Sequence, residues 1–383
     1  MIDVAAQFGP GAVTVAQMLR DGGQRVWFVG GCVRNALMGR AIADVDLTTD
    51  ALPQTVSDLA QRAGMKTVPT GLAHGTVSVI VKGRPFEVTT LRRDVATDGR
   101  HATVAFATDI AQDAGRRDFT MNALYADLDG RLSDPVNGFA DLTARIVRFI
   151  GDPEARITED YLRILRFFRF HAWYGDPDHG IEAEGLAACA AHLDGIARLS
   201  RERIGAEMKK LLSAPDPAPA VAAMGRCGAL MHVLPGAGAA SLPVLVHVEQ
   251  AAGLVADPIR RLAILGGEDV ADHLRLSRAE AARLLRLTTA MADETPPAAL
   301  GYRLGGPEAM DALALRAALS SREIEPDKAV RARFGAGQTF PVRAADLPGL
   351  QGAPLGRRLS RLKAAWVASD FSLTKSALLA DDD

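Results

Sequence analysis

Two different spacings of hydrophobic residues divide the chain into two parts. In the first 140 or so residues, short apolar runs rich in β-branched residues alternate with clusters of Gly, Asp and Pro, a pattern typical of strands joined by turns. The runs are Val26–Val29, Val77–Val81, Phe86–Thr90 and Thr103–Phe106. From about residue 155 onward, Ala, Leu and Arg dominate and apolar residues recur at helical spacing. The pattern predicts an α/β part followed by an all-α part.

Polar residues with capping preferences mark where two of these helices begin. Ser200 precedes an apolar series formed by Ile204, Met208 and Leu211, and serine is a favoured residue immediately before a helix. The segment Ser277-Arg-Ala-Glu280 has the pattern of a capping box, which is a signature of a helix start. We therefore predict one helix that starts after Ser200 and another that starts within this second segment.

Composition limits the class of protein. The chain has 383 residues, of which 48% are hydrophobic and 23% charged, so it can bury real cores and is not predominantly disordered. We find no uninterrupted apolar run of about 18 residues and no N-terminal signal pattern, so we expect neither a membrane protein nor a secreted one. Cys32, Cys189 and Cys227 are far apart and form no zinc or disulfide pattern, which favours a reducing cytoplasm. The net charge of −2 excludes a globally basic nucleic-acid binder but not local basic patches.

The run Val26–Val29 leads into a glycine turn with the character of an anion site. Gly30 and Gly31 follow the expected strand and precede a short helical segment that ends at Gly39. Glycines let the backbone approach a phosphate closely, while free N–H groups point at it. Arg34 adds a planar cation that is suited to phosphate oxygens. Taken alone, such a pair of glycines is more often an ordinary turn.

Two aspartates follow this turn at the spacing of one strand face. Asp44 and Asp46 are separated by one residue, so on a strand both carboxylates would point the same way. Adjacent like charges repel unless a cation lies between them, and Mg²⁺ is a hard, oxygen-ligated ion that leaves room for substrate phosphates. We therefore predict that Asp44 and Asp46 bind Mg²⁺ for nucleotidyl transfer. The alternative is a solvated pair of aspartates at the end of a strand.

Four motifs make the sequence similar to a known family. They are, in order, Gly30-Gly-x-Val-Arg34, Asp44-x-Asp46, Arg116-Arg-Asp-Phe-Thr-Met-Asn122-Ala and Glu159-Asp-Tyr-Leu-Arg163. Over about residues 24–212 the chain resembles the class II tRNA nucleotidyltransferases, which include CCA-adding enzymes and bacterial poly(A) polymerases, and it looks most like the CCA-adding branch. One position departs from the family, because the residue after the turn arginine is usually Asp and here it is Asn35.

The resemblance implies a fold, a division into domains and a reaction. The expected fold is a polymerase-β-like nucleotidyltransferase head at 1–140, followed by a helical neck at 141–212, a helical body at 213–300 and a helical, tRNA-binding tail at 301–383. The expected reaction is template-independent addition of CCA to the 3′ end of tRNA from CTP and ATP, with Mg²⁺ as cofactor and pyrophosphate as product. No protein partner is predicted.

The resemblance also assigns residues to the incoming nucleotide. Those expected to bind its triphosphate and sugar are Gly31, Arg34, Arg116 and Arg117. Asp160 and Arg163 would read the edge that cytosine and adenine share, where an exocyclic amine lies beside a ring-nitrogen acceptor. Arg166 and Arg169 would support them by holding phosphates or packing against the head. On a continuous helix, at about 100° per residue, Asp160 and Arg163 lie about 60° apart, so we expect their side chains to meet.

Several alternatives remain open from the sequence. The helix around Asp160 is equally typical of a salt-bridged amphipathic helix, and Glu87 is a candidate third carboxylate at the metal site. Alternative functions are a poly(A) polymerase, an enzyme that adds only C or only A, and a catalytically inactive RNA-binding module. The polar segment 94–115 resembles a loop that the family needs for the final A, which favours full CCA addition. The basic clusters at 198–210 and 357–363 are candidate contacts for tRNA phosphates, although each is more often a solvated helix face.

Overall fold

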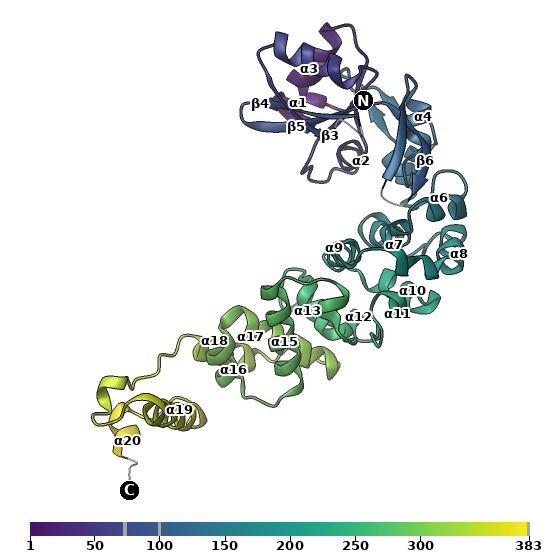
Figure 1. Ribbon diagram of the computed structural model, residues 1–383. Helices are drawn as coiled ribbons and strands as arrows, with labels where there is room; N and C mark the ends of the chain where they lie inside the picture. The colour runs from purple at the N-terminus through teal and green to yellow at the C-terminus, as the bar shows by residue number, and fades with distance from the viewer. Residues whose placement is uncertain (72–74, 99–100, 381–383) are drawn as a thin grey trace. The chain divides into compact units, whose positions relative to one another are not determined.

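The structure is a computed structural model that describes residues 1–71, 75–98 and 101–380. The chain forms two compact units (Figure 1): unit one is Met1–Glu207 with Pro219–Val233, and unit two is Met208–Ala218 with Leu234–Asp383. The predicted order of an α/β part followed by an all-α part is confirmed. The finer division into head, neck, body and tail stays a prediction, and the side chains of much of the predicted loop, at 94–104, lie outside the described residues.

The head of unit one is built on a mixed sheet, which has seven strands in the described part of the chain, in the order β3-β4-β5-β2-β1-β8-β9. Its strands are β1 Val26–Val29, β2 Asp46–Thr49, β3 Lys66–Gly71, β4 Thr76–Val81, β5 Arg84–Thr90, β8 Tyr125–Ala126 and β9 Leu132–Ser133. A separate hairpin is formed by β6 Arg92–Asp98 and β7 His101–Phe106. All four predicted strands are present, whereas β3, β6, β8 and β9 were missed. The helices of the head are α1 Val4–Asp21, α2 Gly31–Leu37, α3 Pro53–Arg62 and α4 Ile110–Gly115.

One face of this sheet is covered by α1. Phe28 of β1 is fully buried and its ring stacks on Phe8 of α1, with a centroid distance of 4.4 Å. Leu47 of β2 pairs with Phe28, and Val88 of β5 pairs with Leu47, and both are buried. These residues form an apolar layer beneath the helix, which explains why the expected short strands are strongly hydrophobic.

The opposite face of the sheet carries acidic side chains. Strands β2 and β5 run parallel, with Asp46 opposite Glu87 and Leu47 opposite Val88. Because successive side chains of a strand alternate between faces, Asp46 and Glu87 project away from the layer that contains Leu47 and Val88. Both acidic residues are exposed.

The remainder of unit one is helical around an aromatic core. Its helices are η2 Thr120–Asn122, α5 Gly138–Thr143, α6 Pro153–Glu159, α7 Leu162–Tyr174, α8 Ala183–Ala191, η3 Leu193–Arg198, α9 Arg201–Leu212 (whose last turn lies in unit two), α10 Ala218–Cys227 and α11 Ala229–Val233. The Phe119 ring lies 4.9 Å from Phe149 and 4.9 Å from Phe170, and Phe149 stacks on Phe167 at 5.3 Å. These rings attach α7 to the end of the head. The predicted start of α9 is confirmed, because Ser200 Oγ accepts from the backbone N–H of the third residue after it at 3.4 Å.

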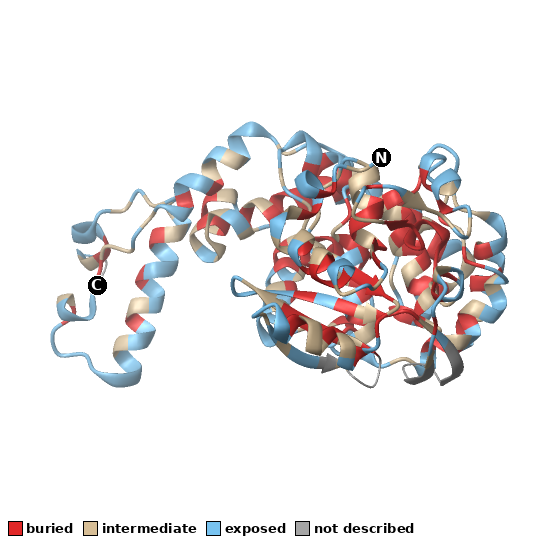
Figure 2. Cartoon of the chain, turned by 90° about the horizontal axis from the view of Figure 1, so that it is seen from above, coloured by how far each residue is buried: buried red, intermediate tan, exposed pale blue. Residues whose placement is uncertain are grey.

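Unit two consists of helices in the described residues. They are α12 Leu242–Ala251, α13 Pro258–Leu265, α14 Val270–His273, α15 Arg278–Ala292, α16 Pro297–Leu304, α17 Gly306–Leu319, α18 Pro326–Ala336, η4 Ala344–Asp346, α19 Gly352–Ala368 and α20 Lys375–Ala380. The predicted capping box of Ser277 and Glu280 is present at the start of α15. Glycines allow α16 and α18 to touch, because a Cβ atom at Gly301 or at Gly335 would lie 1.8 Å from a backbone oxygen of the other helix. Figure 2 shows that the segments near the C-terminus expose most of their residues.

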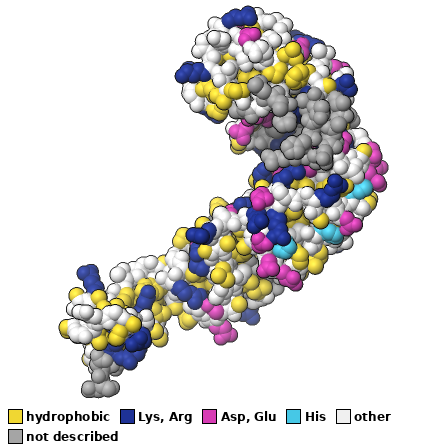
Figure 3. All heavy atoms as spheres, viewed as in Figure 1, with side chains coloured by type: hydrophobic (Ala, Val, Ile, Leu, Met, Phe, Trp, Pro, Cys, Tyr) yellow, Lys and Arg dark blue, Asp and Glu magenta, His cyan; other side chains and the backbone are white. Residues whose placement is uncertain are grey.

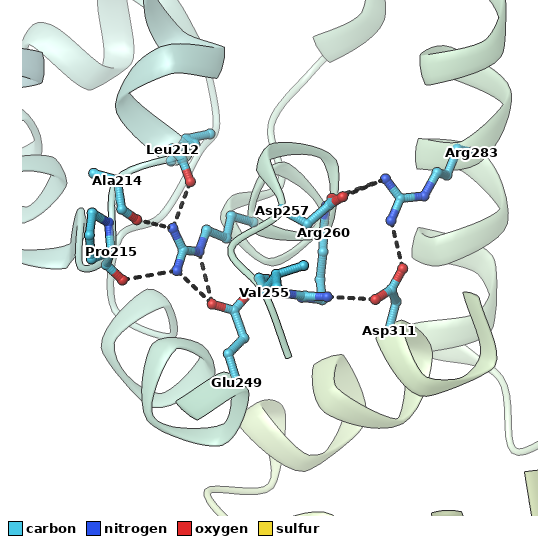
Figure 4. A network of polar contacts seen from close by, with 10 residues as sticks. Leu212, Ala214, Pro215, Glu249, Val255, Asp257, Arg260, Arg283 and Asp311 are labelled. Atoms are coloured by element: carbon cyan, nitrogen blue, oxygen red, sulfur yellow. Dashed lines mark hydrogen bonds and ion pairs between the residues drawn. The ribbon is translucent and has the colours of Figure 1, made fainter. Parts of the chain in front are cut away.

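Figure 4 shows a buried network of charged side chains in unit two. Glu249 of α12 accepts hydrogen bonds from Arg260 Nε at 2.8 Å and from Arg261 Nη2 at 2.7 Å. Arg261 also donates to backbone carbonyls of residues 212–215, and Arg260 donates to Asp311 of α17 at 2.6 Å. The side chains of both arginines and of Glu249 are at most 3% exposed. The network therefore joins α12, α13 and α17 by fully desolvated charges.

We expect Glu249→Gln to lower the free energy of unfolding of unit two by about 2–3 kcal/mol, because it leaves two buried arginines without their shared negative charge. Chemical denaturation monitored by circular dichroism measures the change. The matched control is Glu323→Gln, whose side chain is 71% exposed. Equal stability of the two variants would show that the network does not hold this unit together.

None of the helices in the described ranges combines the length and the apolar character that a membrane span requires.

Candidate functional site

The glycine turn joins β1 to α2. Gly30 has φ 74° and ψ −126°, a conformation that glycine adopts without a steric penalty. A Cβ atom at Gly30 would lie 3.3 Å from Arg117 Nη1, so the missing side chain lets this guanidinium approach the turn. The turn also lies beside Asp46, because Phe28 of β1 pairs with Leu47 of β2. The structure thus brings the turn, an arginine and an aspartate together, as the sequence predicts.

Gly31 begins α2, and Arg34, in the same helix, is only 6% exposed. The Arg34 guanidinium donates to Asn122 Oδ1 at 2.5 Å, to the Tyr174 hydroxyl at 2.7 Å and to Asn35 Oδ1 at 2.9 Å. All three acceptors are neutral, and burial lowers the pKa of Arg34. Asn35 therefore holds the guanidinium without neutralising it. A buried cation with these partners favours an anionic ligand.

Asp113, in α4, holds both arginines of the 116–117 pair. Arg116 Nε donates to Asp113 Oδ1 at 2.8 Å, and Arg117 Nη2 donates to Oδ2 at 2.9 Å. The Tyr125 hydroxyl donates to the same Oδ2 at 2.8 Å. Burial raises the pKa of Asp113, but the two arginines outweigh burial and the net shift is downward, so the carboxyl stays ionised. One carboxylate between two guanidinium groups leaves a net positive charge beside the glycine turn.

A second buried acid links α7 to the glycine turn. Arg166 Nε donates to Asp118 Oδ2 at 2.8 Å, and Asn122 Nδ2 donates to Asp118 Oδ1 at 2.9 Å. Burial raises the pKa of Asp118, but Arg166 and Asn122 outweigh burial and the net shift is downward. Because Asn122 also accepts from Arg34, a continuous chain of hydrogen bonds runs from α7 to α2.

The predicted contact between Asp160 and Arg163 is wrong, because two helices replace the expected continuous one. Asp160 is extended, with φ −155° and ψ 104°, between α6 and α7. Its Oδ1 accepts from Leu162 N at 3.1 Å, a capping bond that competes with continuation of α6. Its Oδ2 accepts from Arg203 Nη2 at 2.7 Å, whereas Arg163 Nη1 donates to Glu159 Oε2 at 2.6 Å.

The turn between α6 and α7 is bonded to the backbone of the 116–117 pair. Arg156 Nη2 donates to the carbonyl oxygen of Arg117 at 2.9 Å, and Arg163 Nη2 donates to that of Arg116 at 3.3 Å. The residues predicted to read the base and those predicted to bind the triphosphate are therefore in direct contact.

Arg166 and Arg169 each contact a buried acid. The partner of Arg166 is Asp118 in the head, and that of Arg169 is Glu207 of α9. These contacts agree with the predicted packing of Arg166 against the head.

The two predicted metal ligands line one hollow, together with Glu87. Strand β2 begins at Asp46, which pairs with Glu87 of β5. Asp44 lies two residues before the strand and not on it as the sequence had predicted. Burial, Glu87 and Asp44 raise the pKa of Asp46, and Arg117 opposes this shift. Desolvation is the largest cause of the raised pKa of Asp46, and the neighbouring carboxylates of Glu87 and Asp44 add to it.

The donors present fit a hard divalent cation. Asp44 and Asp46 offer carboxylate oxygens in a region of mutual repulsion, which a bound cation would relieve. Mg²⁺ is commonly held by one or two carboxylates together with water and substrate phosphates. Across residues 1–71, 75–98 and 101–380, no group of three or more His, Cys, Asp or Glu side chains is arranged to hold a metal. The structure therefore gives no support to Glu87 as a third ligand.

The sequence analysis missed several residues of this site. Asp113 had a usable signal, because it precedes Arg116 and Arg117 by three and four residues, the spacing of neighbours on a helix. No sequence signal could have identified Tyr174 or Arg203, since their partners, Arg34 and Asp160, lie 140 and 43 residues away along the chain.

Known protein families match two segments of the chain. Residues 26–148 match the Poly A polymerase head domain. Residues 180–240 match the probable RNA and SrmB-binding site of polymerase A. The first match contains the glycine turn, the aspartate pair and both arginines of the 116–117 pair.

Individual proteins are similar to longer parts of the chain. Mitochondrial CCA tRNA nucleotidyltransferase 1 of Mus musculus is 43% identical over 211 residues, which cover 54% of this chain and 48% of the mouse protein. The CCA-adding enzyme of Staphylococcus epidermidis is 39% identical over 203 residues, which cover 52% and 49%. The chain thus matches about half the length of these curated relatives. A crystal structure of the Bacillus stearothermophilus CCA-adding enzyme in complex with CTP superimposes with a TM-score of 0.77 at 28% identity, over 97% of this chain and 94% of that one.

The head-domain match falls on the residues that form the site, and the fold extends beyond it over nearly the whole of a solved CCA-adding enzyme. On this evidence residues 26–148 form a domain that matches the Poly A polymerase head domain, and the chain is similar in sequence and in fold to CCA-adding enzymes.

Proposed function

We propose that the chain adds C, C and A in turn to the 3′ end of tRNA, using CTP and ATP and releasing pyrophosphate. The observation that carries this proposal is the position of Asp46 directly beside a glycine turn that Arg34 and Arg117 approach. The names of the curated relatives, CCA tRNA nucleotidyltransferase and CCA-adding enzyme, support the choice of reaction.

The residues of the site divide the work of nucleotidyl transfer. Nucleotidyltransferases of this family generally use a divalent metal ion, and Asp44 and Asp46 would hold Mg²⁺. When bound, Mg²⁺ would stabilise the negative charge that develops on the transferring phosphate. Arg34, Arg116 and Arg117 bind the triphosphate and orient it toward the carboxylates. Hydrogen bonds to Asn122 and Asp113 already hold these guanidinium groups in place before the nucleotide binds.

Single-nucleotide incorporation separates this function from that of a poly(A) polymerase. With Mg²⁺ and tRNA that lacks its last three nucleotides, CTP alone should extend the RNA by two residues, and ATP alone should give almost no product. A long homopolymer from ATP alone would identify a poly(A) polymerase. Absence of incorporation from any nucleotide would identify an inactive RNA-binding protein.

Asp160 and Arg163 remain the proposed readers of the base, although they do not contact each other. A carboxylate has about four lone-pair positions and a guanidinium has five N–H donors. Two positions on Asp160 are occupied by the bonds described above. Arg163 donates to Glu159, to the carbonyl oxygen of Arg116 and, at 2.8 Å, to that of Arg156. Each group is therefore oriented by the protein and retains capacity for a base.

We expect Asp160→Ala and Arg163→Ala each to lower the preference for CTP and ATP over UTP and GTP about tenfold to a hundredfold. Mismatched polar groups in such a site typically cost about 1–3 kcal/mol. The measurement is the ratio of kcat/KM values for the four nucleotides. Unchanged ratios in both variants would mean that the base is read elsewhere and that these residues are structural.

Asp113→Asn should raise KM for CTP about tenfold while leaving KM for tRNA unchanged. The substitution removes the charge that aligns two arginines, and hydrogen bonds to charged groups are worth about 1.5–3 kcal/mol. The matched control is Asp109→Asn, because Asp109 caps the same helix without contacting either arginine. A KM for CTP equal to that of the control would show that Asp113 does not contribute to CTP binding.

We further propose that the helical part after residue 140 supplies much of the tRNA affinity, in a cytoplasmic protein. Arg357, Arg361 and Lys363 are exposed on α19, whereas Arg358 is buried and so cannot belong to the predicted basic surface. Figure 3 shows Lys and Arg side chains dispersed among acidic ones on the visible face, so the contacts would be distributed rather than concentrated in one patch. Their contribution would appear as a salt-dependent tRNA affinity.

A further inference from the structure

One face of α7 is directed at the residues of the proposed triphosphate site. Arg166, Phe170 and Tyr174 recur at every fourth position along the helix, so they form one row on its surface. Arg166 donates to Asp118, and at the other end of the row Tyr174 accepts from Arg34. Phe170 lies between them, with its ring centroid 5.4 Å from that of Tyr174. The row therefore follows the chain of hydrogen bonds that ends at Arg34.

Tyr174 contacts the Arg34 guanidinium in two ways. Its hydroxyl accepts from Arg34 Nη2 at 2.7 Å, and its ring centroid lies 3.9 Å from the guanidinium carbon. A cation over an aromatic face is attracted by the quadrupole of the ring, most strongly where water is excluded. Tyr174 is 9% exposed and Arg34 is 6% exposed, so both contacts are almost fully desolvated. Together they constrain both the position and the direction of the guanidinium.

The acceptors of the Arg34 guanidinium come from three elements. Asn35 belongs to α2 itself, Asn122 to η2 and Tyr174 to the last turn of α7. Asn35 is the next residue of the same helix, so it moves with Arg34. Among the hydrogen bonds in the part of the chain that the structure describes, those to Asn122 and Tyr174 tie this guanidinium to other elements. Loss of the Tyr174 hydroxyl would leave one of the two.

A second cation approaches the same ring. The guanidinium carbon of Arg40 lies 5.2 Å from the Tyr174 ring centroid, and Arg40 Nη1 donates to the carbonyl oxygen of Trp173 at 2.6 Å. Burial lowers the pKa of Arg34, and the charge of Arg40 adds to this shift. Positive charge therefore gathers around the Tyr174 ring. An anion bound at Arg34 would relieve the repulsion, so this arrangement favours a ligand such as a phosphate chain.

We propose that Tyr174 is a positioning residue for the incoming nucleotide. Its hydroxyl and its ring direct the Arg34 guanidinium toward the triphosphate. The proposal rests on the proposed function and adds to it a residue from the helical part of unit one. Arg163, a proposed reader of the base, lies in the first turn of α7, and Tyr174 lies in the last. One helix of 13 residues would then support both the base and the triphosphate of the nucleotide.

The test removes the hydroxyl and keeps the ring. Tyr174→Phe should raise KM for CTP about tenfold, because a hydrogen bond to a charged group is lost, and leave kcat and KM for tRNA unchanged. The inhibition constant of inorganic triphosphate against CTP should rise by the same factor, since this probe has neither base nor sugar. The matched control is Tyr302→Phe, whose ring packs against Trp366 in unit two.

A second substitution separates positioning from packing. If Tyr174 acts through Arg34, the loss of kcat/KM for CTP that Tyr174→Phe causes should nearly vanish in an Arg34→Met background. A residue that only packs α7 against the head would cause the same loss in both backgrounds. Should Tyr174→Phe not fold, as judged by circular dichroism, Tyr174→Met replaces it, with the same direction of change expected.

The outcomes distinguish this proposal from the proposed function. A KM for CTP equal to that of Tyr302→Phe, or an undiminished loss in the Arg34→Met background, would overturn the positioning role of Tyr174 even in a fully active enzyme. If the wild-type chain adds no nucleotide, the proposed function fails. Tyr174 is then judged by equilibrium binding of inorganic triphosphate to the same variants, where equal affinities of Tyr174→Phe and Tyr302→Phe again overturn the proposal.

Discussion

Asp46→Asn should lower kcat for addition of CMP by at least about a thousandfold and leave the fold intact. The neutral amide keeps the shape of the side chain but removes a ligand charge from the proposed metal site. A thousandfold loss corresponds to about 4 kcal/mol of transition-state stabilisation. Desolvation and the charges of Glu87 and Asp44 disfavour the ionised form of Asp46 and raise its pKa, so removing its charge should not destabilise the folded protein.

The measurement is a single-turnover assay with saturating CTP, tRNA and Mg²⁺, together with a thermal melt. Asp44→Asn should behave in the same way, because Asp44 and Asp46 are the two proposed ligands of the same metal ion. Asp21→Asn is the control, since Asp21 is an exposed residue at the end of α1 outside the hollow that these two residues line. Rates for Asp46→Asn close to those of the control would exclude a metal-binding role for Asp46.

Arg34→Met should reduce kcat/KM for CTP by about a thousandfold without destabilising the protein. Arg34 is buried against neutral acceptors, so its charge is left for an anion. Loss of two charge-assisted contacts to phosphate, each worth about 1.5–3 kcal/mol, accounts for an effect of this size. Methionine fills a similar volume and relieves the cost of burying an unneutralised cation, so the melting temperature should be retained or raised.

Opposite changes in activity and stability are what separate a binding role of Arg34 from a structural one. Arg34→Lys should fall between the wild type and Arg34→Met, because it keeps the charge but not the planar fork. If Arg34→Met lowers the melting temperature and the activity in parallel, Arg34 serves to hold α2 against Tyr174 and does not bind the triphosphate.

The local parts of the site could be predicted from the sequence because their causes are local. Four hydrophobic residues, two glycines and a short helical segment suffice to place β1, the turn and α2. Asp46 falls beside that turn because the next strand pairs with β1. In each case the residues that decide the structure are neighbours in sequence or lie on adjacent strands.

The predicted contact between Asp160 and Arg163 was wrong for a physical reason. Helical periodicity continues through this segment, and periodicity alone predicts one helix. Asp160 instead uses its side chain to cap the backbone of Leu162, which gives the chain an alternative to the helix. The partners that then fix both side chains, Arg203 and Glu159, could be recognised only with the fold in hand, since Arg203 comes from another helix.

The contact between the turn that contains Asp160 and Arg163 and the backbone of Arg116 and Arg117 could also not be predicted from sequence patterns. Arg163 and Arg156 bind the carbonyl groups of Arg116 and Arg117 across 47 and 39 residues of chain. If Arg163 reads the base, as proposed, its displacement by a wrong base would disturb the backbone of Arg116 and Arg117, the proposed phosphate ligands. Such a disturbance would couple the choice of base to the efficiency of transfer.

The central claim is that one site adds C twice and then A once, without a nucleic-acid template. Its most direct test uses three RNA substrates, namely tRNA that lacks the last three nucleotides, the last two, or only the last one, each incubated with Mg²⁺ and a single nucleoside triphosphate. The mass of each product identifies what was added. The account predicts C on the first two substrates, A on the third and no extension beyond it; addition of A to the first substrate, or continued addition to the third, would contradict it.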